Sequence, residues 1–177
     1  MEQLSDFENI QKVLKPQDSF LVELKDNVYG VRFIGFKLRD YDTGEVYHEY
    51  KANNIYELDY FADHMLEYEF PNKLLRSKTI GSDLTFVVGD NPVKNLDFVE
   101  KHFIDDELVK SYEFKFPFFM PNSQNNIEFI YSVPELKSSV AERLNSNEDI
   151  NAKSDTYVFV EGKLIIHRRA EYRYTKK

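Results

Sequence analysis

The chain has 177 residues, of which 15% are aromatic, and it contains no cysteine. A chain of this length can close a sizeable core within one domain, and the absence of cysteine excludes disulfide bonds and thiolate metal sites. The formal net charge of −8 argues against a nucleic-acid partner, which needs a basic surface. No apolar run is long enough to cross a membrane, so we expect a cytoplasmic protein.

The first strongly patterned segment, residues 4–14, places Phe7, Ile10 and Leu14 at helical spacing and predicts a short amphipathic helix that ends before Pro16. Residues 31–50 then read as two strands joined by a turn at residues 42–44. In the first of these strands, alternation predicts Val31 and Phe33 on one face, opposite to Ile34, Phe36 and Leu38.

The acidic residues are concentrated between positions 40 and 69. The only lysine or arginine in this stretch is Lys51. The stretch contains nine carboxylates: Asp40, Asp42, Glu45, Glu49, Glu57, Asp59, Asp63, Glu67 and Glu69. Such a block is either a solvated face or an acidic lip for a basic partner.

The rest of the chain reads mainly as strands. Residues 52–65 are ambiguous between a helix and an irregular connection, and strand patterns resume at residue 66. Two long strands, about 95–104 and 107–120, meet at Asp105-Asp106, a helix is predicted to start at Pro134, and a last hairpin turns at Glu161-Gly162. We therefore predict an all-β protein, an antiparallel β-sandwich with one or two short helices. Residues 1–26 form an N-terminal segment, and residues 27–177 form the sandwich domain.

The stretch "SYEFKFPFFMPNS" puts Tyr112, Phe114, Phe116 and Phe118 at every second position. In an extended strand these four rings point to one face. The pattern alone leaves two interpretations open, because the rings either fill an ordinary core or line a space between sheets that bulky side chains hold apart.

No catalytic chemistry is indicated. The nucleotide-binding, zinc-protease and serine-hydrolase motifs are missing, and the four histidines are far apart in the sequence. No feature selects a pair of carboxylates as a glycosidase-type pair. We predict no enzymatic activity, no catalytic residue, no metal and no cofactor.

Longer stretches carry a family resemblance over roughly residues 33–174. "FKLRDYDTGEVYHE", "YEFPNKLL", "VGDNPVKNL", "EKHF" and "SDTYVFVEGKLIIHRRAEYRY" occur in this order. Together they resemble the GMP-phosphodiesterase delta-subunit superfamily, and in particular its acyl-binding branch, the uncoordinated-119 or retinal protein four family.

This resemblance implies an immunoglobulin-like sandwich with an internal hydrophobic lipid pocket. It implies a chaperone that solubilises N-myristoylated proteins by burying the myristoyl or lauroyl group of the cargo. A GTP-bound Arf-like small GTPase would release the cargo, in traffic toward cilia, flagella or other membranes. Two alternatives stay open: a prenyl-binding carrier of the delta-subunit kind, and a lipid-free β-sandwich adaptor.

The resemblance also assigns site residues. The central aromatic strand would form one wall of the acyl tunnel, and the acid-x-His pair Glu100 and His102 would contact the first peptide groups of the cargo. The full set of lipid-binding residues that we predict is Phe36, Leu38, Tyr68, Leu74, Glu100, His102, Tyr112, Phe114, Phe116, Phe118, Val133, Tyr157, Phe159 and Tyr172. Pro117 stands where the family tends to have glycine, and it should lie at an edge or a bulge because it cannot donate to a sheet ladder.

Overall fold

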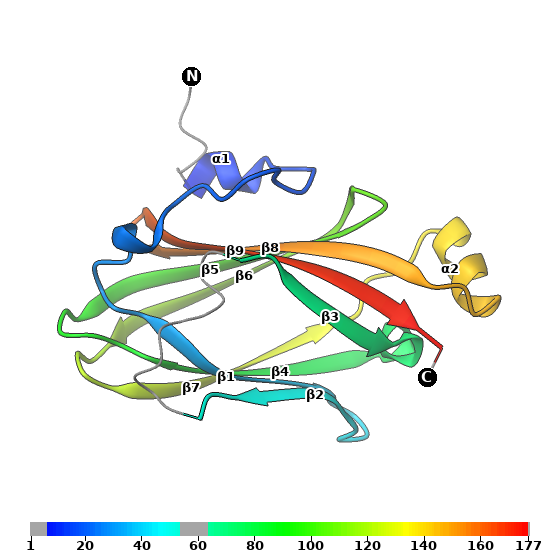
Figure 1. Cartoon of the computed structure of the whole chain (residues 1–177), viewed down its shortest axis with the longest axis horizontal. Coiled ribbons are helices and arrows are strands. Elements are labelled where there is room, and N and C mark those ends of the chain that lie inside the picture. The colour runs from blue at the N-terminus through cyan, green and yellow to red at the C-terminus, as the bar shows by residue number, and fades with distance from the viewer. Residues whose placement is uncertain (1–6, 54–63, 177) are drawn as a thin grey trace.

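The strands form two packed sheets in a computed structural model that describes residues 7–53 and 64–176 (Figure 1). The four-stranded sheet has the order β2 (Val46–Lys51), β1 (Arg32–Asp40), β4 (Thr79–Val87) and β7 (Gln124–Ser132). The five-stranded sheet has the order β3 (Leu66–Pro71), β9 (Lys163–Thr175), β8 (Ile150–Val160), β5 (Val93–Ile104) and β6 (Glu107–Phe119). The predicted all-β sandwich is confirmed, although the edge strand β3 pairs with β9 in parallel.

Tight turns set the register of the long hairpins. The β5–β6 turn has Asp105 and Asp106 at φ 53° and 58°, and the β8–β9 turn has Glu161 and Gly162 at φ 50° and 79°. Two consecutive residues with positive φ match the right-handed twist of the flanking strands. Both turns lie where the sequence predicts them.

The alternation along β1 is broken near its start. The pairing with β4 shifts between Phe33 and Gly35, and a one-residue bulge exchanges the two faces of a strand. As a result Phe33 packs on the interior cluster, as Phe36 and Leu38 do further along the strand. The prediction that Phe33 faces away from Phe36 is therefore wrong.

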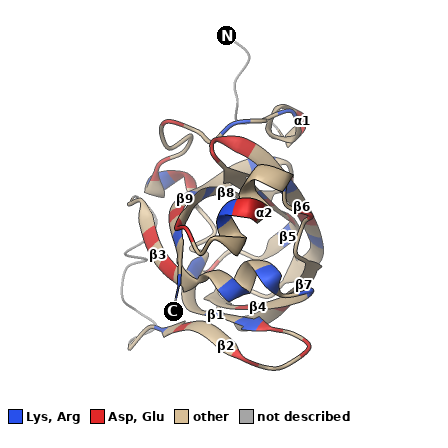
Figure 2. Ribbon diagram, turned by 90° about the vertical axis from the view of Figure 1, so that its right-hand side faces the viewer, with Lys and Arg blue, Asp and Glu red and all other residues tan. Residues whose placement is uncertain are grey.

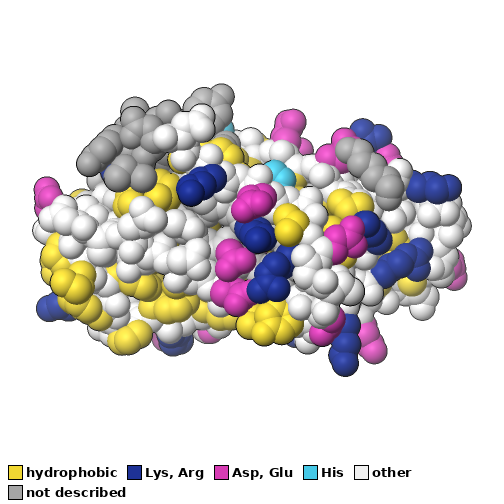
Figure 3. Space-filling view, turned by 90° about the horizontal axis from the view of Figure 1, so that it is seen from below, with side chains coloured by type: hydrophobic (Ala, Val, Ile, Leu, Met, Phe, Trp, Pro, Cys, Tyr) yellow, Lys and Arg dark blue, Asp and Glu magenta, His cyan; other side chains and the backbone are white. Residues whose placement is uncertain are grey.

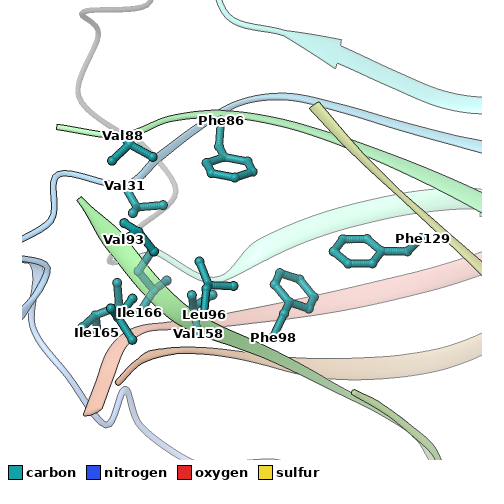
Figure 4. Packing of buried hydrophobic residues seen from close by; sticks show 11 residues of the cluster. Val31, Phe86, Val88, Val93, Leu96, Phe98, Phe129, Val158, Ile165 and Ile166 are labelled. Atoms are coloured by element: carbon teal, nitrogen blue, oxygen red, sulfur yellow. The ribbon is translucent and has the colours of Figure 1, made fainter. Parts of the chain in front are cut away.

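A dry core closes one end of the sandwich (Figure 4). Phe98 on β5 and Phe129 on β7 point toward each other from opposite sheets, with ring centroids 4.8 Å apart. The other buried members of this cluster are Val31, Phe86, Val88, Val93, Leu96, Val158, Val160, Ile165 and Ile166. The cluster fills the space between the sheets at this end.

Short helices lie outside the two layers. The helix α1 (Phe7–Gln11) lies over the outer face of the five-stranded sheet (Figures 1 and 2). The helix α2 (Ser138–Asn145) begins four residues after Pro134, where the sequence predicts its start, and it buries Val140 and Leu144. Two 3-10 turns, η1 (Leu24–Asp26) and η2 (Asn72–Arg76), complete the elements of the described residues. Most of the ambiguous 52–65 segment falls outside the described residues.

A mixed band of basic and acidic side chains crosses the outer face of the four-stranded sheet, with apolar side chains beside it (Figure 3). Arg39 bonds Glu128 and lies 3.8 Å from Asp83, packed over Gly81, where a Cβ would come within 3.3 Å of the guanidinium carbon. Phe129 and Phe86 of this sheet face the other sheet, whereas Ile130 and Val46 are 46% and 45% exposed. Among the described residues, no helix is long and apolar enough to cross a membrane.

Candidate functional site

A cavity of about 500 Å³ lies between the two sheets beyond the dry core. Its walls are the inner faces of the strands, and its apolar part includes Phe33, Phe36, Leu84, Phe98 and Phe129. The cavity also reaches residues 64–67, at the start of β3. Its volume falls within the roughly 300–1,000 Å³ of small-molecule sites.

A second, smaller cavity of about 80 Å³ continues toward η2 and residues 133–136. Phe36, Ser82, Glu100 and Tyr172 belong to the walls of both cavities. These four residues therefore form the boundary between the two spaces.

The boundary carries polar groups in otherwise apolar surroundings. Nε2 of His102 lies 2.6 Å from Oε1 of Glu100, and the hydroxyl oxygens of Tyr172 and Ser154 lie 2.5 Å apart. The Glu100 and His102 side chains retain about a quarter of their exposure. A carboxylate that borders a cavity can accept a hydrogen bond from an amide N–H. The boundary can thus bind the polar end of a ligand whose apolar part lies in the larger cavity.

Several tyrosines lie near this carboxylate. Burial, reinforced by the negative charge of Glu100, raises the pKa of Tyr112 to about 12. The same two causes raise the pKa values of Tyr131 and Tyr172 well above the ordinary value. All three phenols therefore stay protonated at neutral pH, and Tyr112 donates a hydrogen bond to the carbonyl oxygen of Ser132.

His48 joins the two sheets at the β2–β3 side of the larger cavity. The centroid of its ring lies 5.2 Å from the ring centroid of Tyr68, 5.8 Å from that of Phe36 and 5.9 Å from that of Phe70. Burial among these rings lowers the pKa of His48, because desolvation disfavours the charged imidazolium.

We expect His48 to make the protein less stable in mild acid. In the unfolded chain His48 has a pKa of about 6.5 and binds a proton more readily than in the folded protein. The contribution of His48 to the free energy of unfolding is therefore complete above that pH and is lost as the pH falls below it. Urea denaturation at pH 7.5 and 5.5 should show a larger loss of unfolding free energy in the wild type than in His48→Phe. Equal losses in both proteins would show that folding does not lower the pKa of His48.

Comparison with known proteins decides the family. The family model described as "GMP-PDE, delta subunit" matches residues 25–174. The chain is 38% identical over 160 residues to Protein unc-119 of Caenorhabditis elegans. This match covers 88% of the chain and 73% of that protein. The chain is also 33% identical over 178 residues to Protein unc-119 homolog B of Homo sapiens. That match covers 94% of the chain and 70% of the human protein. The chain belongs to the unc-119 family. This family lies within the GMP-phosphodiesterase delta-subunit superfamily of lipid-binding carriers, as the sequence resemblance predicts.

Most residues that the resemblance to the unc-119 family selects do border the two cavities. Phe36, Glu100 and Tyr172 lie at the boundary, and Tyr68 lines the larger cavity. The smaller cavity is lined by Leu38, Leu74, His102, Tyr112 and Val133, in addition to the boundary residues. Strands from both sheets thus bring these nine positions together, although their contact with a lipid stays a prediction.

The aromatic strand β6 behaves differently from the expectation. Tyr112 reaches the smaller cavity, but Phe114 and Phe116 pack against the dry core, with Phe114 4.4 Å from Phe129. Phe118 is 49% exposed. The expectation that these three rings line a tunnel together with Tyr112 is therefore corrected.

The outward position of Phe118 has its cause in the β5–β6 pair at Pro117. Asn95, with φ 48°, lies between the paired positions that flank Pro117. Inward side chains here are three residues apart instead of two. On β5 they are Val93 and Leu96, and on β6 they are Phe116 and Phe119. Pro117 occupies an irregular site on an edge strand, where a missing N–H is tolerated, and Phe118 is turned outward.

This assignment predicts opposite results for neighbouring rings of β6. Phe116→Ser should lower the free energy of unfolding by about 2 kcal/mol or more, because it removes packing against Phe119 and Phe129. Phe118→Ser should change it by less than about 0.5 kcal/mol. Thermal and urea denaturation of the two variants would measure both effects, and a large loss in Phe118→Ser would contradict the assignment.

Tyr157 and Phe159 lie on the outer face of the five-stranded sheet. Both are fully buried there, in a cluster with Ile10 and Val13 of the N-terminal segment. Their neighbours Thr156 and Val158 face the interior instead. The prediction that they belong to the pocket wall is wrong. Because both faces of this sheet are covered, apolar residues occur on both, and an apolar pattern does not reveal which face a ring occupies.

Several cavity residues carried little signal in the sequence. Ser82 and Ser154 are polar and small, and His48 gives no hydrophobic periodicity. Leu84 and Phe129 could have been found, because each lies on the apolar face of an alternating strand. Within the acidic block, only Glu67 lines the larger cavity among the described residues.

Proposed function

We propose that this protein is a carrier that solubilises N-terminally acylated proteins by burying the acyl chain between its two sheets. The observation that supports this most directly is the cavity of about 500 Å³, whose walls are mostly apolar and which has a polar boundary at Glu100. In this proposal the chain lies against Phe98 and Phe129, and the first amide of the cargo meets Glu100 and His102.

The energetics of chain burial are sufficient for this function. At about 0.8 kcal/mol per buried CH₂, a myristoyl chain offers on the order of 10 kcal/mol of gross transfer free energy. A single myristoyl chain binds a membrane only marginally. A protein cavity can therefore compete with the bilayer, without covalent chemistry and without a metal or cofactor.

We further propose that a GTP-bound Arf-like GTPase releases the cargo, as the resemblance implies. Release requires only that the GTPase binds the unloaded form more tightly than the loaded form. Stopped-flow measurement should show faster dissociation of a fluorescent acyl peptide when such a GTPase is added with GTP than with GDP. The same dissociation rate with both nucleotides would remove this part of the proposal.

Titration with three peptides of the same sequence tests the function itself. An N-myristoylated or N-lauroylated Gly peptide is expected to bind with submicromolar affinity, and the unmodified peptide is expected not to bind. Tighter binding of a farnesylated peptide would favour the prenyl carrier, and binding that ignores the lipid would favour the lipid-free adaptor.

A further inference from the structure

Residues 7–22 cross the outer face of the five-stranded sheet, and we call this segment the N-terminal strap (Figures 1 and 2). Its side chains Phe7, Ile10, Val13, Leu21 and Val22 pack on an apolar patch of the sheet, formed by Val99, Phe103, Tyr157, Phe159 and Leu164. Ile10 is 0% exposed and Phe7 makes an edge contact with Phe159, with centroids 5.3 Å apart. The strap is therefore part of the folded domain.

Three buried polar residues of the sheet bind the main chain of the strap. Nζ of Lys101 donates to the carbonyl oxygens of Gln11 and Val13, both at 3.0 Å. The amide of Gln17 donates to Oδ2 of Asp155 at 2.8 Å.

The third of these residues is His167. The amide of Leu21 donates to Nδ1 of His167 at 3.1 Å, and Nε2 of His167 lies 3.1 Å from Oδ1 of Asp155. Lys101, Asp155 and His167 are each 1% exposed. Because buried polar groups need hydrogen-bond partners, these residues depend on the strap.

Lys101, Asp155 and His167 anchor the strap, and each of them has a cavity residue beside it on its own strand. Lys101 stands between Glu100 and His102, Asp155 stands between Ser154 and Thr156, and His167 precedes Arg168; all five of these neighbours border a cavity. Successive side chains of a strand point to opposite faces. The strap and the cavity thus act on the two faces of the same stretches of backbone.

We infer that Lys101, Asp155 and His167 are positioning residues, through which the N-terminal strap holds the cavity wall in its binding-competent shape. The inference rests on the proposed function, and it concerns the regulation of that same site. With the strap docked, the backbone that carries Glu100 and His102 is fixed before the ligand arrives, which lowers the cost of binding. Release of the strap removes this preorganisation and weakens binding. By thermodynamic linkage, ligand binding must tighten the strap by the same factor.

Lys101→Met tests the anchor nearest to the polar boundary. It keeps the length of the side chain and removes the ammonium group, and we expect about tenfold weaker binding of the acylated peptide, within the roughly 5- to 150-fold range of coupled sites. The matched control is Lys94→Met, which changes an exposed lysine of the same strand and should leave the affinity unchanged. Unchanged affinity in Lys101→Met would overturn the inference.

Hydrogen exchange of the wild-type protein provides a test that needs no variant. Saturating acylated peptide should slow the exchange of the Gln17 and Leu21 amides, which are bonded to Asp155 and His167 on the face opposite the cavity. A merely structural strap would exchange at the same rate with and without peptide, and that result would overturn the inference. If the wild type bound no acylated peptide, the proposed function would fail first; binding without these two effects would remove only the positioning role.

Discussion

Replacing Ser82 by phenylalanine is expected to lower the affinity for an acylated peptide by at least about 100-fold. Ser82 is 8% exposed on β4 and belongs to the walls of both cavities. A phenyl ring at this position would occupy the space between them. A 100-fold loss corresponds to about 2.8 kcal/mol, a modest part of the roughly 10 kcal/mol that burial of the chain offers. Calorimetric titration with a lauroylated Gly peptide would measure it.

Lys37→Phe is the matched control for Ser82→Phe. Lys37 belongs to the neighbouring strand β1 and pairs with Asp83, on the polar outer face of the same sheet. The same ring is added there without entering a cavity, so acyl binding should be unchanged. Full affinity in a folded Ser82→Phe variant would show that the ligand does not pass the boundary between the cavities.

Replacing Asp155 by alanine is expected to cause the largest loss of stability, about 3–5 kcal/mol. The carboxylate is 1% exposed and accepts hydrogen bonds from the Gln17 amide and the His167 ring, with Nε of Arg169 3.9 Å away. Its removal leaves these buried donors without an acceptor, which costs more than an exposed pair contributes. Urea denaturation at pH 7.5 would measure the loss.

Asp97→Ala provides the comparison for Asp155→Ala. Asp97 lies on β5, and its side chain keeps 20% of its exposure beside Lys115 at 3.6 Å. A pair of this kind contributes about 0–1 kcal/mol, so the variant should be nearly as stable as the wild type. A similarly small loss in Asp155→Ala would show that the N-terminal strap is not held by this carboxylate.

The hairpin register was predictable because short-range chemistry determines it. Turn residues at 105–106 and 161–162, combined with alternating strands, are sufficient to predict two long hairpins. The family resemblance then selected the cavity boundary at Glu100 and Tyr172, which no periodicity singles out.

The errors come from features that are not local. The bulge at Phe33 and the irregularity at Pro117 each change which ring faces the interior, and one such change reverses every later position. Tyr157 and Phe159 were misplaced because the N-terminal strap buries the outer face of their sheet, so apolar residues occur on both faces. A strand pattern does not report what covers its second face.

The central claim is that an acyl chain lies between the sheets, and an NMR measurement of a bound peptide tests it most directly. A myristoylated Gly peptide with a ¹³C-labelled terminal methyl group would be bound to the wild-type protein. We predict nuclear Overhauser effects between this methyl group and the ring protons of Phe98 or Phe129, which border the larger cavity. Effects to exposed Phe118, or to the rings of the outer cluster around Tyr157, would contradict the account.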